Sequence, residues 1–285
     1  MIADRFESLS PELKRAASWV AMHGSALALH SMRDSARAAD VTPATMTRLA
    51  RRLGFDGFEG LRAPFRRELA GNGSGAEFER MLQLRRGSTP LDEVVSSLNS
   101  LQQGNVASVL ARNRSEQIEA AAREIIEANQ VCFLGLRVCY GVATYLSYAY
   151  GLLRPNGQLV TGIGGMMSDQ IARFAAGDVM LAVSQAPYTR QTVEGVVQAA
   201  DNGAKVIALT DSKLSPLARA ATHVLLYDTA SSTHFHSTAG AQALAEALIA
   251  AVAARGGAQA MTHLRRVRKH LRDSGAYWDR VSNKE

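Results

Sequence analysis

The chain has few cysteines and no long uncharged hydrophobic run. Its two cysteines, Cys132 and Cys139, are too few for a disulfide framework or a zinc module. Its apolar runs are shorter than the roughly 18 residues that a membrane-spanning helix needs. The N-terminal segment MIADRFESLS lacks the apolar core of a signal peptide. These absences exclude disulfide-stapled and membrane-spanning proteins, and we expect a cytoplasmic protein with no membrane partner.

Positive charge is what the chain has in excess. It carries a formal net charge of +6 over 285 residues, with a pI of about 9.6. Residues 42–67 hold six arginines against two acidic residues, and residues 262–285 hold seven basic residues against three acidic ones. This balance favours an anionic partner. We interpret the second cluster as a solvated helix end rather than as a second binding surface.

Residues 32–58, MRDSARAADVTPATMTRLARRLGFDGF, have the pattern of two helices joined by a tight turn. A helix over 32–38 meets a break at 39–41. A second helix then begins at Thr42, which can cap it, and Pro43, which suits its first position. Helical periodicity gives the second helix an apolar face of Met46, Leu49, Ala50 and Leu53. The opposite, basic face carries Ala44, Thr47, Arg48 and Arg51, with Thr45 and Arg52 at its flanks.

Such a helix fits the design of a helix-turn-helix reader of the DNA major groove. The alternative is an amphipathic surface helix with solvated arginines. Three details favour DNA binding: Ala36 is small where the helices cross, Val41 is apolar where the turn meets the core, and Asp40 tolerates a left-handed backbone. Gly54 then predicts the end of the second helix.

The order of these segments resembles the N-terminal domain of RpiR-type bacterial transcriptional regulators. The resemblance rests on LSPELKRAASWV (9–20), the helix-turn-helix pattern and ARRLGFDGFEGLRAPFRREL (50–69), with RLGFDGF as its most specific part. It implies that a sugar-isomerase-type (SIS) domain follows and senses a metabolite, often a sugar phosphate.

The pattern of the chain changes after its helical first part. Further helices are predicted over 10–23, 58–70, 76–86, 91–111 and 115–128, with residues 71–75 as the clearest linker. Five short apolar strands are then expected over 131–136, 158–162, 178–184, 205–210 and 223–227. Helices alternate with them over 139–153, 166–175, 189–202, 215–220 and 238–255. This alternation predicts a parallel sheet covered on both faces.

The expected fold is therefore multidomain. An all-α helix-turn-helix domain precedes a three-layer, doubly wound, SIS-like α/β domain with a parallel five-stranded sheet. We expect residues 1–75 to bind DNA, residues 76–128 to form a linker and helices, and residues 129–258 to sense a ligand and oligomerise. Residues 259–285 would form a basic C-terminal tail.

In a doubly wound sheet, ligands bind beyond the carboxyl ends of the strands. The candidate segments are 135–139, 184–190 and 210–214, and residues 231–236 are placed to close over them. The candidate ligand-binding residues are Gly135, Arg137, Cys139, Ser184, Gln185, Tyr188, Thr189, Arg190 and His234.

The loop after the third strand departs from the pattern of the resembled family. That family often shows a Ser-x-Ser-Gly-x-Thr loop, whose hydroxyls and backbone amides hold a phosphate at a helix N-terminus. Here Ser184 and Thr189 remain, Ala186 lacks the second hydroxyl, and Pro187 replaces the glycine and removes a backbone donor. We therefore expect that this loop does not cradle a phosphate in the usual way.

Two hypotheses for the ligand follow from this departure. In the first, Arg137 and Arg190 replace the missing hydroxyls and amides as charged contacts to an anion. In the second, Tyr188 and Gln185 recognise a neutral compound or a carboxylate. The position of both arginines at strand-end turns favours an anionic ligand, and the alternative role for each is a surface ion pair. After the first strand, Cys139 and Arg137 also replace a common serine and a common glycine of the family.

Nothing in the sequence indicates a cofactor, a metal site or catalysis. His234 and His236 have no third metal ligand nearby in sequence, and a pocket-lining role suits His234 better. A sugar isomerase needs a positioned acid or base. His234, His236 and Glu194 are available for that role, but Glu194 has no reactive neighbour in sequence. We expect no catalytic residues and no enzyme activity. An aldose–ketose isomerase with an accessory helical domain is the main alternative, and a protein-interaction scaffold is another.

The favoured function is a ligand-responsive transcriptional regulator of carbohydrate or related metabolite genes. The side chains expected at base edges or nearby phosphates are Thr42, Ala44, Thr45, Thr47 and Arg48. Arg51 and Arg52 would mostly contact phosphates. One helix-turn-helix covers only a half-site. The expected partners are therefore a double-stranded DNA operator, a small-molecule effector and further copies of the chain, in a homodimer or homotetramer.

Overall fold

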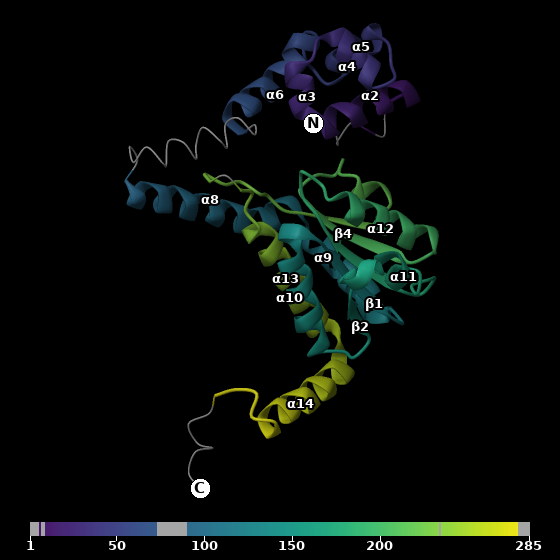
Figure 1. Cartoon of the computed structure of the whole chain (residues 1–285), viewed down its shortest axis with the longest axis vertical. Helices are drawn as coiled ribbons and strands as arrows, with labels where there is room; N and C mark the ends of the chain where they lie inside the picture. Colours follow the sequence, from purple (N-terminus) through teal and green to yellow (C-terminus); the bar gives the residue numbers. More distant parts are fainter. Residues whose placement is uncertain (1–5, 7–8, 73–89, 234, 279–285) are drawn as a thin grey trace. The chain divides into compact units, whose positions relative to one another are not determined.

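The structure, a computed structural model, describes residues 6, 9–72, 90–233 and 235–278. The helix predicted over 76–86 and the candidate His234 lie outside the described residues. The chain divides into two compact units (Figure 1). The first comprises Met1–Gln103 with Lys213–Ser215 and Ala230–Ser237, and the second comprises the remainder. The domain boundaries at 75, 128 and 258 stay predictions.

The first unit is helical, as the sequence predicts. Its helices are α2 (Pro11–Met22), α3 (Gly24–Leu29), α4 (Met32–Ala38), α5 (Pro43–Arg52), α6 (Phe58–Asn72) and the first part of α8 (Leu91–Arg112). The short α3 was not predicted, because no side chain caps this six-residue helix and marks its start. The apolar face of α5 lies in the core of this unit, with Met46, Leu49 and Ala50 fully buried and Leu53 only 2% exposed.

A tight turn joins α4 to α5. Asp40 adopts a φ of +52°, in the left-handed region. The N–H of Val41 donates to the carbonyl of Ala36 at 3.0 Å, and Ala36 itself is 1% exposed. Beyond α5, Gly54 with a φ of +92° ends the helix. The roles predicted for these four residues are thereby confirmed.

The second unit contains a five-stranded parallel sheet, which confirms the predicted fold class. Its strands are β1 (Val131–Gly135), β2 (Gly157–Leu159), β3 (Val179–Val183), β4 (Lys205–Thr210) and β5 (His223–Leu226). Their order across the sheet is β2-β1-β3-β4-β5, and every neighbouring pair is parallel. Val131 pairs with both Gly157 and Val179, so the first three strands begin at one level.

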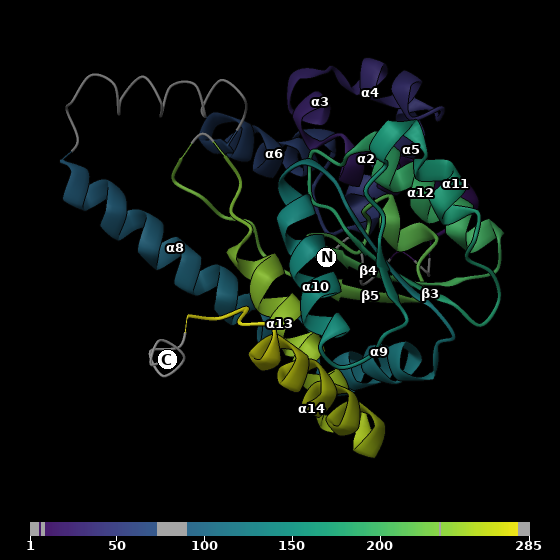
Figure 2. The same cartoon turned by 60° about the horizontal axis from the view of Figure 1, so that its bottom comes forward.

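Helices cover both faces of this sheet. Alternate residues of each strand point to opposite faces, and apolar side chains on each face pack against the helices there. Phe133, Leu181 and Leu209 pack against α9 (Ser115–Glu127), α10 (Tyr140–Gly151) and α13 (Ala239–Arg255). Leu134, Met180 and Val206 pack on the other face, against α11 (Met167–Ile171) and α12 (Arg190–Asp201). Figures 1 and 2 show these two layers of helices on either side of the strands.

Three elements differ from the sequence prediction in length. The strand predicted over 158–162 spans only Gly157–Leu159, because Gly162 turns the chain away at a φ of +65°. The helix predicted over 166–175 spans Met167–Ile171, and the segment predicted over 215–220 is a single 3-10 turn, Leu217–Arg219. In the predicted basic tail, α14 (Gly257–Asp273) follows α13 directly.

Candidate DNA-binding surface and effector site

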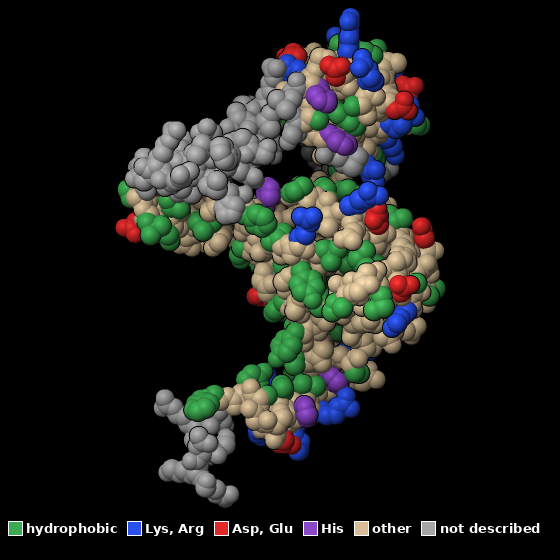
Figure 3. Space-filling view, viewed as in Figure 1, with side chains coloured by type: hydrophobic (Ala, Val, Ile, Leu, Met, Phe, Trp, Pro, Cys, Tyr) green, Lys and Arg blue, Asp and Glu red, His purple; other side chains and the backbone are tan. Residues whose placement is uncertain are grey.

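The exposed side of α5 carries most of the predicted DNA contacts. Thr42, Ala44, Arg48, Arg51 and Arg52 are exposed, and Thr47 is half-buried with its hydroxyl donating to the carbonyl of Pro43 at 3.2 Å. The Thr42 hydroxyl caps the helix by accepting the N–H of Thr45 at 3.2 Å. Lys and Arg side chains stand out from the surface of this unit in Figure 3.

Thr45 corrects one of these predictions, because its side chain is 1% exposed and does not face a DNA groove. Its hydroxyl lies between two charged groups, donating to Glu12 Oε2 at 3.5 Å and accepting from Arg48 Nη2 at 3.1 Å. Arg48 and Glu12 also form an ion pair, with Nη2 and Oε2 3.3 Å apart. Glu12, in the first turn of α2, therefore orients Arg48 of α5. The two residues are 36 positions apart, so no local sequence pattern indicates this contact.

Arg62 corrects the charge argument, because this arginine of the 42–67 cluster is a structural residue. Its side chain is 10% exposed, its Nη1 donates to the carbonyl of His30 at 2.7 Å, and its Nη2 lies 2.9 Å from Glu59 Oε2. The guanidinium also lies over the ring of Phe58. It therefore adds nothing to the positive surface available to DNA.

In the second unit, the turn after β1 is tight and requires glycine at position 135. A Cβ on Gly135 would lie 2.6 Å from the carbonyl oxygen of Cys139, so only glycine fits there. Arg137 is exposed and has a φ of +55°, the left-handed region that favours the glycine it replaces. Cys139 is 3% exposed, and burial raises the pKa of its thiol to about 11.

The loop after β3 brings the remaining candidates to the same edge of the sheet. Ser184 and Gln185 are buried, so neither they nor Cys139 present a side chain to solvent. Thr189 is half-buried, and the Ala186–Pro187 peptide bond is cis. The ligand-binding roles of these residues stay predictions.

Arg190 does not turn toward the strand ends. Its side chain is 90% exposed, and its Nε lies 2.6 Å from Glu194 Oε1, one helical turn along α12. This ion pair raises the pKa of Arg190. The structure thus favours the surface-ion-pair interpretation of Arg190 over the anion-contact hypothesis. It also places Glu194, the acid or base candidate for an isomerase, in that same pair.

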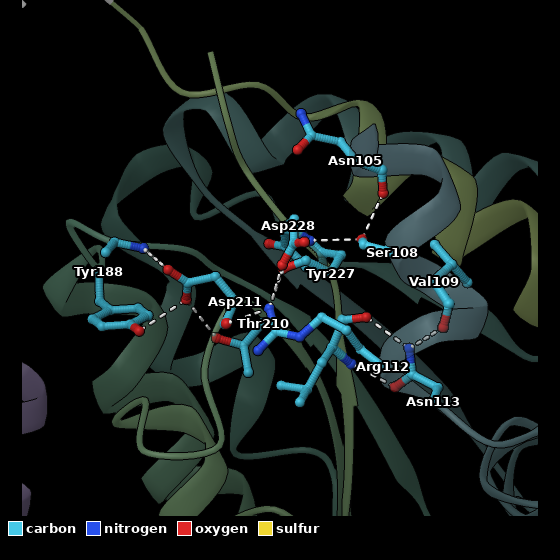
Figure 4. A network of polar contacts seen from close by, with 12 residues as sticks. Asn105, Ser108, Val109, Arg112, Asn113, Tyr188, Thr210, Asp211, Tyr227 and Asp228 are labelled. Carbon is cyan, nitrogen blue, oxygen red and sulfur yellow. Dashed lines mark hydrogen bonds and ion pairs between the residues drawn. The ribbon is translucent and has the colours of Figure 1, made fainter. Parts of the chain in front are cut away.

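Asp211, directly after β4, is the central side chain at this edge (Figure 4). Its Oδ1 accepts the Tyr188 hydroxyl at 2.8 Å and the Thr210 hydroxyl at 3.3 Å. Its Oδ2 accepts the backbone N–H of Ala186 at 3.2 Å. Burial, and then the neighbouring Asp211 carboxylate, raise the pKa of Tyr188. The segment 210–214 was predicted to lie here, but the role of Asp211 was missed.

The last turns of α8 contact the same edge of the sheet (Figure 4). Nη1 of Arg112 donates to the carbonyls of Asp211 at 3.0 Å and Tyr227 at 3.2 Å, and lies 2.6 Å from Asp228 Oδ1. The Asn113 amide donates to the carbonyl of Leu226 and accepts its N–H, both at 2.7 Å. These contacts join residues about a hundred positions apart, so sequence reasoning missed them.

No three His, Cys, Asp or Glu side chains gather as metal ligands within the part of the chain that the structure describes. No helix among the described residues has the length and apolar character to cross a membrane.

A helix-turn-helix unit joined to a three-layer α/β unit with its candidate loops at the strand ends defines a DNA-binding regulator with a sugar-isomerase-type sensor. Family models match the same two parts: residues 1–72 match the helix-turn-helix domain of the rpiR family, and residues 124–277 match the SIS domain. The chain belongs to the SIS-domain family and is an RpiR-type transcriptional regulator.

Named relatives and solved structures agree with this assignment. The chain is 26% identical to the HTH-type transcriptional regulator HexR of Pseudomonas aeruginosa, over 95% of this chain and 94% of that one. It is 31% identical to the sugar isomerase domain of an RpiR transcription factor from Sphaerobacter thermophilus, with a TM-score of 0.59 over 62% of this chain and 99% of that one.

A third likeness concerns the fold alone. The Vibrio vulnificus NanR protein, solved in complex with ManNAc-6P, is 17% identical to this chain. The match has a TM-score of 0.60 and covers 97% of this chain and all of that one.

Proposed function

We propose that this regulator reads an operator through the exposed side of α5 and that a small-molecule effector at the carboxyl ends of β1, β3 and β4 controls that reading. The observation that carries the first half is the exposed group Thr42, Ala44, Arg48, Arg51 and Arg52 on a helix whose opposite face is fully buried. The regulated genes would serve carbohydrate metabolism, as the names of the solved relatives suggest.

Effector binding without turnover suits the strand ends better than catalysis. Glu194, the candidate acid or base on α12, is paired with Arg190 at the surface. A homodimer or homotetramer would supply the two half-site readers that an operator needs.

The contacts of Arg112 support a route from effector to DNA. Arg112 ends α8 and contacts the backbone of Asp211, whose side chain lies in the candidate effector site. Along the chain, α8 leads back toward the helix-turn-helix residues. An effector that shifted Asp211 and Asp228 would therefore shift the end of α8. Such a shift requires that the effector bind two arrangements of the protein with different affinities.

DNA binding tests the proposal directly. Duplexes enriched from a random-sequence library by the purified protein would be titrated at several salt concentrations. Arg48→Ala combined with Arg51→Ala should weaken binding by roughly 10- to 100-fold. Each lost phosphate contact should also lower the slope of log affinity against log salt by about 0.9.

The matched control is Arg15→Ala, which removes an exposed arginine from α2 in the same unit. It should leave both affinity and salt slope close to those of the wild type. If the double variant binds the enriched duplexes as tightly as Arg15→Ala does, α5 does not read DNA and the proposal fails.

A further inference from the structure

The loop between β3 and α12 is already occupied by a carboxylate of the chain itself. The Ala186 N–H and the Tyr188 hydroxyl both donate to Asp211, at 3.2 and 2.8 Å. Pro187, between them, has no N–H to offer. These are donors that a phosphate oxygen would need at this edge, and they hold a side-chain anion instead.

The Asp211 carboxylate is also nearly saturated with donors. A carboxylate offers about four acceptor positions on its two oxygens. The Tyr188 hydroxyl, the Thr210 hydroxyl and the Ala186 N–H use three of them. One position remains for an incoming hydroxyl, which is a donor, whereas a phosphate dianion offers only acceptors and a like charge.

Two of the arginines, Arg190 and Arg112, are committed to partners within the chain. Arg190 is 90% exposed and paired with Glu194. Arg112 is paired with Asp228 and donates to two backbone carbonyls with the same Nη1. Arg137 stands exposed at the turn after β1, with no ion pair to another described side chain. Lys213, two positions after Asp211, is exposed as well. A phosphate in the loop would therefore face the Asp211 carboxylate, with Arg137 and Lys213 as the cations of the candidate segments that form no ion pair with another described side chain.

We propose that Asp211 is a built-in anion that closes this loop to phosphate groups, so that the effector of this site is a hydroxyl-rich compound without a phosphate. The inference rests on the proposed function, in which these strand ends hold the effector. It replaces the anionic ligand favoured by the sequence with a neutral one, because Arg190, one of the two arginines that suggested an anion, is paired with Glu194 at the surface.

Removing the charge of Asp211 tests the inference. Asp211→Asn keeps the size and an acceptor oxygen, whereas Asp201→Asn removes an exposed charge from the far end of α12 as a matched control. Melting temperatures would be measured against inorganic phosphate and against matched pairs, glucose with glucose 6-phosphate and N-acetylmannosamine with its 6-phosphate. A compound that binds the native state raises the melting temperature.

We expect no phosphate-dependent stabilisation of the wild type or of Asp201→Asn. Asp211→Asn should bind the phosphorylated probes about tenfold more tightly than the wild type, because the like charge is gone. Tyr188→Phe, which removes one donor to Asp211 but keeps the ring, gives a second variant if Asp211→Asn does not fold. It should leave the charge in place and the wild type's indifference to phosphate unchanged.

Two results would overturn the inference. The first is a wild type that phosphorylated sugars stabilise more than their parent sugars do. The second is an Asp211→Asn variant that folds and stays indifferent to phosphate, which would mean that Asp211 does not close the loop. Binding of the unliganded wild type to enriched duplexes is measured separately, so a failure of DNA binding is not confused with either result.

Discussion

Asp40 is the residue that turns the chain between α4 and α5. Its φ of +52° lies where only glycine is unstrained, and asparagine and aspartate are the side chains that tolerate it best. The residue is exposed, so its contribution to stability comes from backbone conformation rather than from packing.

Substitutions at Asp40 should therefore follow backbone preference. Asp40→Ala should destabilise the helical unit by about 1 kcal/mol, and Asp40→Gly should leave its stability within about 0.5 kcal/mol of the wild type. Chemical denaturation followed by circular dichroism measures both. Equal losses in the two variants would mean that the Asp40 side chain, and not the left-handed backbone, matters.

Under the proposed function, the Arg48–Glu12 pair would hold the guanidinium of Arg48 in place before DNA arrives. Both side chains are more than half exposed, so the pair contributes little to stability. A phosphate or a base edge can replace Glu12 at small cost. Glu12 thus orients the guanidinium without competing strongly for it.

At the scale of elements, a buried amide helps to fix the end of α8 to the sheet, alongside the contacts of Arg112. Asn113 is 3% exposed, and its amide bonds both backbone groups of Leu226 and the carbonyl of Val109. Asn113→Ala should destabilise the second unit by about 2–4 kcal/mol, because it leaves the N–H and carbonyl of Leu226 without partners.

Asn202→Ala is the matched comparison for that change, since Asn202 is an exposed asparagine at the end of α12. Its effect on the free energy of unfolding should stay within about 0.5 kcal/mol. A loss for Asn113→Ala no larger than this would show that water replaces the amide at Leu226.

Elements and single residues were predictable to different degrees. Periodicity and caps located α5 and its buried face, and apolar runs located all five strands, because those signals are local. Thr45 was misplaced because its neighbour Glu12 lies 33 positions away. Asp211 and Arg112 were missed for the same reason: their partners meet only when β3, β4 and β5 come together in the sheet.

On the scale of the whole molecule, the chain has separate hydrophobic cores. One is formed by the helices around α5, and two lie on the opposite faces of the sheet. Because none of the described residues belongs to both the helical core and a sheet core, the two units need not unfold together.

Scanning calorimetry should accordingly resolve two transitions. Asp40→Ala should lower the midpoint of one, and Asn113→Ala should lower the midpoint of the other by several degrees. A single transition that both substitutions lower equally would show that the units unfold as one.

The amide of Asn113 has a further consequence for the molecule in a crowded solution. β5 is one of the two edge strands of the sheet, and an edge strand with unpaired backbone groups can add a strand from another chain and begin aggregation. At Leu226, the side-chain amide of Asn113 already bonds the backbone N–H and carbonyl that an added strand would use. Asn113 therefore also protects this part of β5 from unwanted strand addition.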